Sequence, residues 1–182
     1  HKLLTANSST GNRVMGYDSN NNLTSDALSV DGNTFTVQYR YNGNDALSSM
    51  TYPRSGRVVD YAPDTLGRPT KASGFISSVS YWPSGQIRVL SYANGTTTEY
   101  DQNSRLWPSS VVVKKSGTAY VNSNYQYDSA GNLTSISDFT DGNFTRSLGY
   151  DSLNRLTSAS GPWGTGAIDY DGGGNITSQR FG

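Results

Sequence analysis

The sequence contains no cysteine, a single histidine and one glutamate, and charged residues make up only 15% of it. Without cysteine the chain can form neither disulfide bonds nor thiolate metal sites, and it offers no thiol nucleophile. The 14 basic and 14 acidic side chains balance, and no basic stripe marks a nucleic-acid surface. No apolar run approaches the ~18 residues of a membrane-spanning helix. We therefore expect neither a nucleic-acid partner nor a membrane span.

Groups for hydrolytic catalysis are equally scarce. The only histidine is His1, which is best explained as an arbitrary start or a tag remnant, so a serine nucleophile would lack a base. A carboxylate pair for glycoside hydrolysis would have to include Glu99 or Asp60. The other aspartates are spread along the chain, whereas metal-binding loops need clustered carboxylates. The sequence predicts no catalytic, metal-binding or cofactor-binding residue, and a chain that is not an enzyme.

Tyrosine and glycine are abundant instead, with 13 and 20 residues. Hydrophobic residues account for 34% of the chain and aromatic residues for 12%. So low a share of aliphatic side chains disfavours a thick layered core, whereas tyrosines can cover a large area of a thin sheet. Because charged residues are also few, the composition is not that of a disordered chain.

A short frame recurs along the chain: Tyr-Asp, a small loop that ends in Asn or Arg, an aliphatic residue, and in most copies Thr-Ser. Six positions separate the tyrosine from the aliphatic residue. Successive copies begin roughly 20 to 27 residues apart, which is the scale of one supersecondary unit. The defining copies are Tyr17-Asp18 to Leu23, Tyr100-Asp101 to Leu106, Tyr127-Asp128 through Gly131 to Leu133, Tyr150-Asp151 to Leu156, and Tyr170-Asp171 to Ile176.

Looser copies extend the array over most of the chain. They run from Tyr41 to Leu47, from Tyr52 to Val58, from Tyr81 to Ile87 and, with proline in the tyrosine position, from Pro63 to Pro69. We therefore expect one repeat array over residues 17–182, preceded by a lead-in strand or partial repeat over residues 1–16.

The frame predicts a β-hairpin turn. In residues 128–131 (Asp-Ser-Ala-Gly) the aspartate suits the first position of a type I turn, because its carboxylate can accept hydrogen bonds from the backbone that follows. The closing glycine can take the positive φ of a hairpin with a G1 bulge. Such a hairpin would place Tyr127 opposite Leu133 and Tyr125 opposite Ser135, and each aromatic–aliphatic pair would fix the register. We expect the tyrosines to pack and the aspartates to cap turns.

A second set of turns is predicted between the frames. Asp31-Gly32 and Asn94-Gly95 suit two-residue hairpin turns, and Gly117 separates two strand-like runs. Helical periodicity is absent, and the enrichment in Thr, Val and Tyr favours strands. The predicted fold is all-β: tandem antiparallel hairpins that form a curved, continuous β-strip.

Three tryptophans leave an alternative open. Trp82, Trp107 and Trp163 each stand beside a proline, and they could either fill corners of the sheet or stack on sugars. A carbohydrate-binding or cell-surface-binding module would require at least two of them to lie exposed and side by side.

The frame Tyr-Asp-x-x-Gly-Asn/Arg-Leu-Thr-Ser, as in Tyr127–Ser135 and Tyr150–Ser158, resembles the YD repeat of Rhs proteins, toxin-complex shells and teneurin-type proteins. The resemblance runs from Tyr17 to Gly182 and rests on tandem copies. It implies a structural segment of a hollow β-shell that encloses a toxic C-terminal part of its own polypeptide. The implied partners are the rest of the shell, the enclosed toxin and a secretion-system component, with export from a bacterial cell.

In some members of this family, aspartates of a C-terminal core region cut the toxin free. No segment of this sequence matches that region, so no residue is assigned that role. The resemblance implies an internal stretch of shell.

Overall fold

The computed structural model describes residues 2–181, so His1 and Gly182 lie outside the described residues. The described chain is built from β-strands and one short 3-10 turn at Gly142–Phe144. It divides into two compact units. Unit 1 comprises the residues up to Ser80 with Leu90–Asn94, and unit 2 comprises Tyr81–Val89 with the residues from Gly95 onward.

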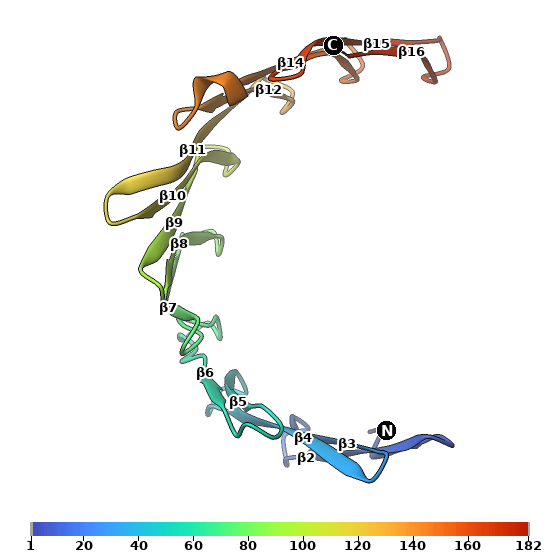
Figure 1. Ribbon diagram of the computed structural model, residues 1–182, viewed down its shortest axis with the longest axis vertical. Helices are drawn as coiled ribbons and strands as arrows, with labels where there is room; N and C mark the ends of the chain where they lie inside the picture. Colours follow the sequence, from blue (N-terminus) through green and yellow to red (C-terminus); the bar gives the residue numbers. More distant parts are fainter. Residues whose placement is uncertain (1, 182) are drawn as a thin grey trace. The chain divides into compact units, whose positions relative to one another are not determined.

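In unit 1, six strands form one antiparallel sheet in chain order. Figure 1 shows each strand beside the next one along the chain, from the blue N-terminal strands to the green β6. The strands are β1 (Thr5–Asn7), β2 (Gly11–Tyr17), β3 (Leu23–Val30), β4 (Asn33–Tyr41), β5 (Leu47–Thr51) and β6 (Val58–Asp60).

In unit 2, the strands from β9 to β16 likewise pair antiparallel with their neighbours in the chain. The boundary between the units falls within β7 (Ile76–Tyr81) and β8 (Ile87–Tyr92). The other strands are β9 (Thr96–Gln102), β10 (Pro108–Lys115), β11 (Thr118–Tyr127), β12 (Leu133–Asp138), β13 (Arg146–Tyr150), β14 (Leu156–Gly161), β15 (Gly164–Tyr170) and β16 (Ile176–Arg180). The predicted all-β fold of tandem antiparallel hairpins is confirmed.

Within each unit the sheet is one layer thick, and no helix or second sheet covers a face of the described residues (Figure 1). A single layer has little interior, so Val59 and Ala159 are the only apolar side chains of the described chain that are buried. The stability of such an array comes from the contacts of each hairpin with the next one.

Two kinds of turn alternate along the chain. Because consecutive strands are antiparallel, each kind of turn lies at its own edge of the sheet. We call the edge with the predicted Tyr-Asp frames the Tyr-Asp edge, and the opposite edge the second edge. The turns of the Tyr-Asp edge are residues 18–22, 42–46 and 64–68 in unit 1, and 82–86, 103–107, 128–132, 151–155 and 171–175 in unit 2.

Candidate functional site

The Tyr-Asp edge is the most regular feature of the molecule, and all eight of its turns share one backbone geometry. In the turn at 128–132, the amide of Asp128 donates to the carbonyl of Asn132 at 3.0 Å, and the amide of Gly131 donates to the carbonyl of Asp128 at 3.3 Å. The fourth residue of each turn has a positive φ, which explains why glycine and asparagine are common there. These residues are Asn21, Asp45, Gly67, Gly85, Leu106, Gly131, Asn154 and Gly174.

The first side chain of the turn caps it. The Oδ1 atom of Asp128 accepts from the amides of Ala130 and Asn132 at 2.9 Å each, and its Oδ2 atom accepts from the Nδ2 atom of Asn132 at 2.9 Å. Arginine replaces the asparagine in two copies, where Asp64 pairs with Arg68 and Asp151 with Arg155 at 2.7 Å. Each carboxylate is thus held by its own turn.

These hydrogen bonds lower the pKa of the capping carboxylates. The largest cause is the hydrogen bond from the residue four positions on, through its side chain for Asp64, Asp128 and Asp171 and through its backbone for Asp18 and Asp151. The aspartates are therefore ionised hydrogen-bond acceptors at neutral pH.

The predicted cross-strand register is confirmed at Tyr127, which lies opposite Leu133. The same pairing recurs at four other copies of the frame. They are Tyr17 with Leu23, Tyr41 with Leu47, Tyr150 with Leu156, and Tyr170 with Ile176.

The prediction for Tyr125 is wrong, because Tyr125 lies opposite Ile136 and not Ser135. The register shifts between Gln126 and Tyr127, which marks a β-bulge directly after the turn. The bulge brings Leu133 and Ile136 onto one face although they are three residues apart. The sequence feature that could have predicted this bulge is the three-residue spacing of Leu133 and Ile136 within one strand.

The copy predicted at Tyr100-Asp101 to Leu106 is displaced by two residues. The turn is capped by Asn103, whose Oδ1 atom accepts from the amides of Arg105 and Trp107 at 2.9 and 3.1 Å. Tyr100 and Asp101 lie inside β9, opposite Val111 and Ser110, and Leu106 is the residue with positive φ. Gln102 and Pro108 face each other in the places of the tyrosine and the aliphatic residue. Asn caps as well as Asp, so a chance Tyr-Asp pair misled the prediction.

The looser copy predicted from Tyr52 to Val58 is also wrong. The turn that follows Tyr52 belongs to the second edge, and Val58 lies opposite Thr51. The proline-containing copy is confirmed, since Pro63 pairs with Pro69.

In several copies the repeat tyrosine links its repeat to the one before it. The hydroxyl of Tyr150 donates to the backbone carbonyl of Leu133 at 3.0 Å, and the hydroxyl of Tyr170 donates to that of Leu156 at 2.9 Å. In unit 1, Tyr41 donates to Leu23 at 3.0 Å, and burial raises the pKa of Tyr41, so its hydroxyl stays protonated. Each acceptor is the aliphatic residue of the preceding frame.

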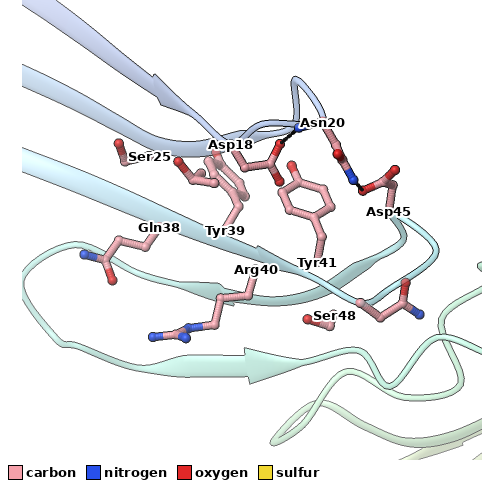
Figure 2. Close-up of a pocket in the computed structure, with 11 residues that line it drawn as sticks. Asp18, Asn20, Ser25, Gln38, Tyr39, Arg40, Tyr41, Asp45 and Ser48 are labelled. Carbon is pink, nitrogen blue, oxygen red and sulfur yellow. Dashed lines mark hydrogen bonds between the residues drawn. The ribbon is translucent and has the colours of Figure 1, made fainter.

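A second link joins successive turns directly. The Nδ2 atom of Asn22 donates to the Oδ1 atom of Asp45 in the next turn at 2.7 Å, and Asn20 donates to the same oxygen at 2.9 Å. Figure 2 shows Asn20 between Asp18 and Asp45, with Tyr41 beside them. In unit 2, Asn132 reaches Asn154 in the same way at 2.8 Å.

Arginine makes this link by a different contact. The guanidinium of Arg155 lies 4.4 Å from the ring centroid of Tyr170 in the next repeat, where it forms a cation–π contact. The Tyr-Asp edge is therefore a chain of interlocked turns within each unit.

The three tryptophans differ in their surroundings. Trp82 donates through its Nε1 atom to the carbonyl of Tyr100 at 3.0 Å, and the ring of Trp107 packs 5.1 Å from that of Tyr127. Both are half-buried in successive turns of the Tyr-Asp edge. Only Trp163, at the second edge, is exposed. The described residues thus lack two exposed tryptophans side by side.

The carboxylates considered for catalysis form ordinary ion pairs. Asp60 lies 2.7 Å from the Nζ atom of Lys71, and Glu99 lies 2.7 Å from that of Lys114. Between residues 2 and 181, no three acidic or histidine side chains converge as metal ligands. Nor does that part of the chain contain a helix long and apolar enough to cross a bilayer.

Part of this edge matches a known protein family. A family profile described as RHS Repeat matches residues 127–165, which contain the turns at 128–132 and 151–155. A comparison with curated protein sequences found no match.

Several solved structures share the fold. The crystal structure of TcdB2-TccC3 without its hypervariable C-terminal region superposes with a TM-score of 0.80 at 18% identity, over 100% of this chain and 12% of that one. TcdB2-TccC3-Cdc42 has a TM-score of 0.79 at 18% identity, over 98% of this chain and 12% of that one. A Photorhabdus luminescens Tc holotoxin pore has a TM-score of 0.79 at 18% identity, over 98% of this chain and 11% of that one. This chain thus spans about an eighth of the length of these proteins. Residues 127–165 therefore match an RHS repeat, and turns of the same backbone geometry recur along the rest of the described chain.

Proposed function

We propose that the chain is a wall segment of an Rhs-type shell that encloses a polypeptide cargo. The observation that carries this proposal is the unbroken succession of Tyr-Asp hairpins, whose fold superposes over its full length on part of TcdB2-TccC3. A wall needs a thin sheet that can be extended without limit. A single-layer array with one hairpin added per repeat meets that need.

The links between repeats support a structural role. The capping carboxylates hold their turns, as Asp151 does, and the tyrosine hydroxyls of several copies join two repeats, as that of Tyr150 does. The pKa values of these aspartates are lowered, whereas a general acid at neutral pH needs a raised one. We therefore assign the edge a structural and not a catalytic role.

We also propose that the lead-in at residues 1–16 is the second half of a repeat, followed by the array over 17–182. The hydroxyl of Tyr17 donates to the carbonyl of Leu3 at 3.1 Å, which is the contact that Tyr41 makes with Leu23. Leu3 therefore takes the place of the aliphatic residue of a frame.

The remaining assignments follow from the shell role. The partners are the rest of the shell polypeptide, its enclosed toxin segment and a secretion-system component, and the site of action is outside the producing bacterial cell. The sugar-binding alternative is not supported, because it requires two exposed tryptophans side by side, and Trp82 and Trp107 are half-buried.

Protease protection of the full-length parent protein tests the proposal. The C-terminal segment should survive digestion of the native protein and should be degraded once the shell is unfolded in guanidinium. Rapid loss of that segment from the native protein, while the repeats stay intact, would contradict it.

A further inference from the structure

Two repeats lack the tyrosine of the frame: proline replaces it at Pro63, and glutamine replaces it at Gln102. In several copies the tyrosine donates to the carbonyl of the aliphatic residue of the preceding repeat, as Tyr150 does to Leu133 and Tyr170 to Leu156. In the displaced copy, Gln102 stands in that place, opposite Pro108. By the same count, the aliphatic residue of the preceding frame is Ile87, which directly follows the turn at 82–86.

The side chain of Gln102 does not take over the tyrosine's position. Its Oε1 atom accepts a hydrogen bond from the hydroxyl of Ser84 at 3.3 Å, out at the turn. Ile87 is accordingly 39% exposed, whereas Leu133 and Leu156, which each accept from a tyrosine hydroxyl, are half-buried. The missing ring leaves apolar surface uncovered.

A pocket of about 350 Å³ lies at this place. Its walls are mainly apolar, and all of its residues belong to unit 2. They are Trp82, Gln86, Ile87, Tyr100, Asp101 and Pro108.

The pocket is held in shape by contacts around Trp82. The guanidinium of Arg88 lies 4.6 Å from the centroid of its ring, and its Nε1 atom donates to the carbonyl of Tyr100 at 3.0 Å. A pocket whose wall is fixed before binding costs less to occupy than one that must be ordered.

We propose that this pocket binds a tyrosine side chain of a second polypeptide segment. The repeat itself shows what fits: a phenol ring against the aliphatic residue, with its hydroxyl directed to the carbonyl of that residue. The bound ring would lie against Ile87 and Pro108. Its hydroxyl would donate to the carbonyl of Ile87, as the hydroxyl of Tyr150 donates to that of Leu133. The proposal rests on the repeat geometry and does not depend on the shell role.

Titration of the full chain with N-acetyl-L-tyrosinamide, followed by NMR of the tryptophan indole N–H groups, tests the proposal. The signal of Trp82 should shift, while those of Trp107 and Trp163 stay in place. A dissociation constant of about 1 mM is expected for so small a ligand. Substitution Gln102→Tyr should weaken binding at least tenfold, because the repeat's own tyrosine then fills the pocket.

A matched control is Gln126→Tyr, which also adds a tyrosine, in an exposed strand position outside the pocket, and should leave the affinity unchanged. If Gln102→Tyr does not fold, Ile87→Ser removes the apolar floor and should also weaken binding at least tenfold. The proposal is overturned if the folded variants keep the affinity of the parent chain, if the three indole signals shift alike, or if N-acetyl-L-phenylalaninamide binds equally well.

Discussion

The hydroxyl of Tyr150 lies 3.0 Å from the backbone carbonyl of Leu133 and joins two repeats that share no turn. Equivalent bonds connect Tyr41 to Leu23 and Tyr170 to Leu156. In a sheet with no second layer, such bonds fix how one hairpin sits on the next. The geometry that recurs in each repeat therefore serves the contacts between repeats as much as the turn itself.

Removal of this hydroxyl alone should weaken the array. Tyr150→Phe keeps the ring and deletes the donor, and we expect a loss of about 1 kcal/mol in the free energy of unfolding. Urea denaturation followed by circular dichroism measures it. Tyr120→Phe is the control. Because Tyr120 is 61% exposed, this substitution should leave the free energy of unfolding unchanged within experimental error. Equal effects of the two substitutions would contradict a linking role for Tyr150.

The caps should depend mainly on an acceptor oxygen and less on its charge. Asp128→Ala removes the acceptor for two backbone amides and should lower the midpoint of urea unfolding. Asp128→Asn should keep most of the stability, because Asn103 caps its own turn with the same two amide contacts. Equal midpoints for the two variants would contradict the role given to the acceptor oxygen.

Acid should destabilise the array in a defined range of pH. In the folded chain, hydrogen bonds within the turns lower the pKa of Asp128, Asp151 and Asp171 below the ordinary value of an aspartate. Their contribution is therefore complete above the unfolded pKa of about 3.9 and is lost as the pH falls through the folded values. The urea midpoint should hold between pH 7 and 5 and fall steeply below pH 4. A variant with all three changed to Asn should lose less over that range, and an identical pH profile would refute the assignment.

The glycine at the fourth turn position should matter most where a neighbour crowds it. At Gly131, φ is +96° and an added Cβ would lie 3.1 Å from the ring of Trp107. At Gly174, φ is +87° and the nearest atom would lie 3.8 Å away, on Arg155. Both alanine substitutions should cost about 1 kcal/mol for the backbone, and Gly131→Ala should cost more because Trp107 must move. Thermal unfolding of the two variants compares them, and a larger effect at Gly174 would contradict the packing described.

The sequence sufficed for the hairpins because local turn chemistry and the spacing of Tyr127 and Leu133 act within a few residues. It failed at Tyr125, where a bulge changes the face, and at Tyr100, where pairing of β9 with β10 decides the register. The bonds from Tyr150 to Leu133 join different repeats, and no short-range pattern encodes them. The sequence did not predict the pocket beside Ile87 either, because the pocket arises where Gln102 replaces the tyrosine of the frame.

Cryo-electron microscopy of the full-length parent protein tests whether this chain is a wall segment. We expect a hollow β-shell in which residues 17–182 form part of the wall and in which density for a polypeptide lies inside. An open or solid rod of repeats with nothing enclosed would contradict it.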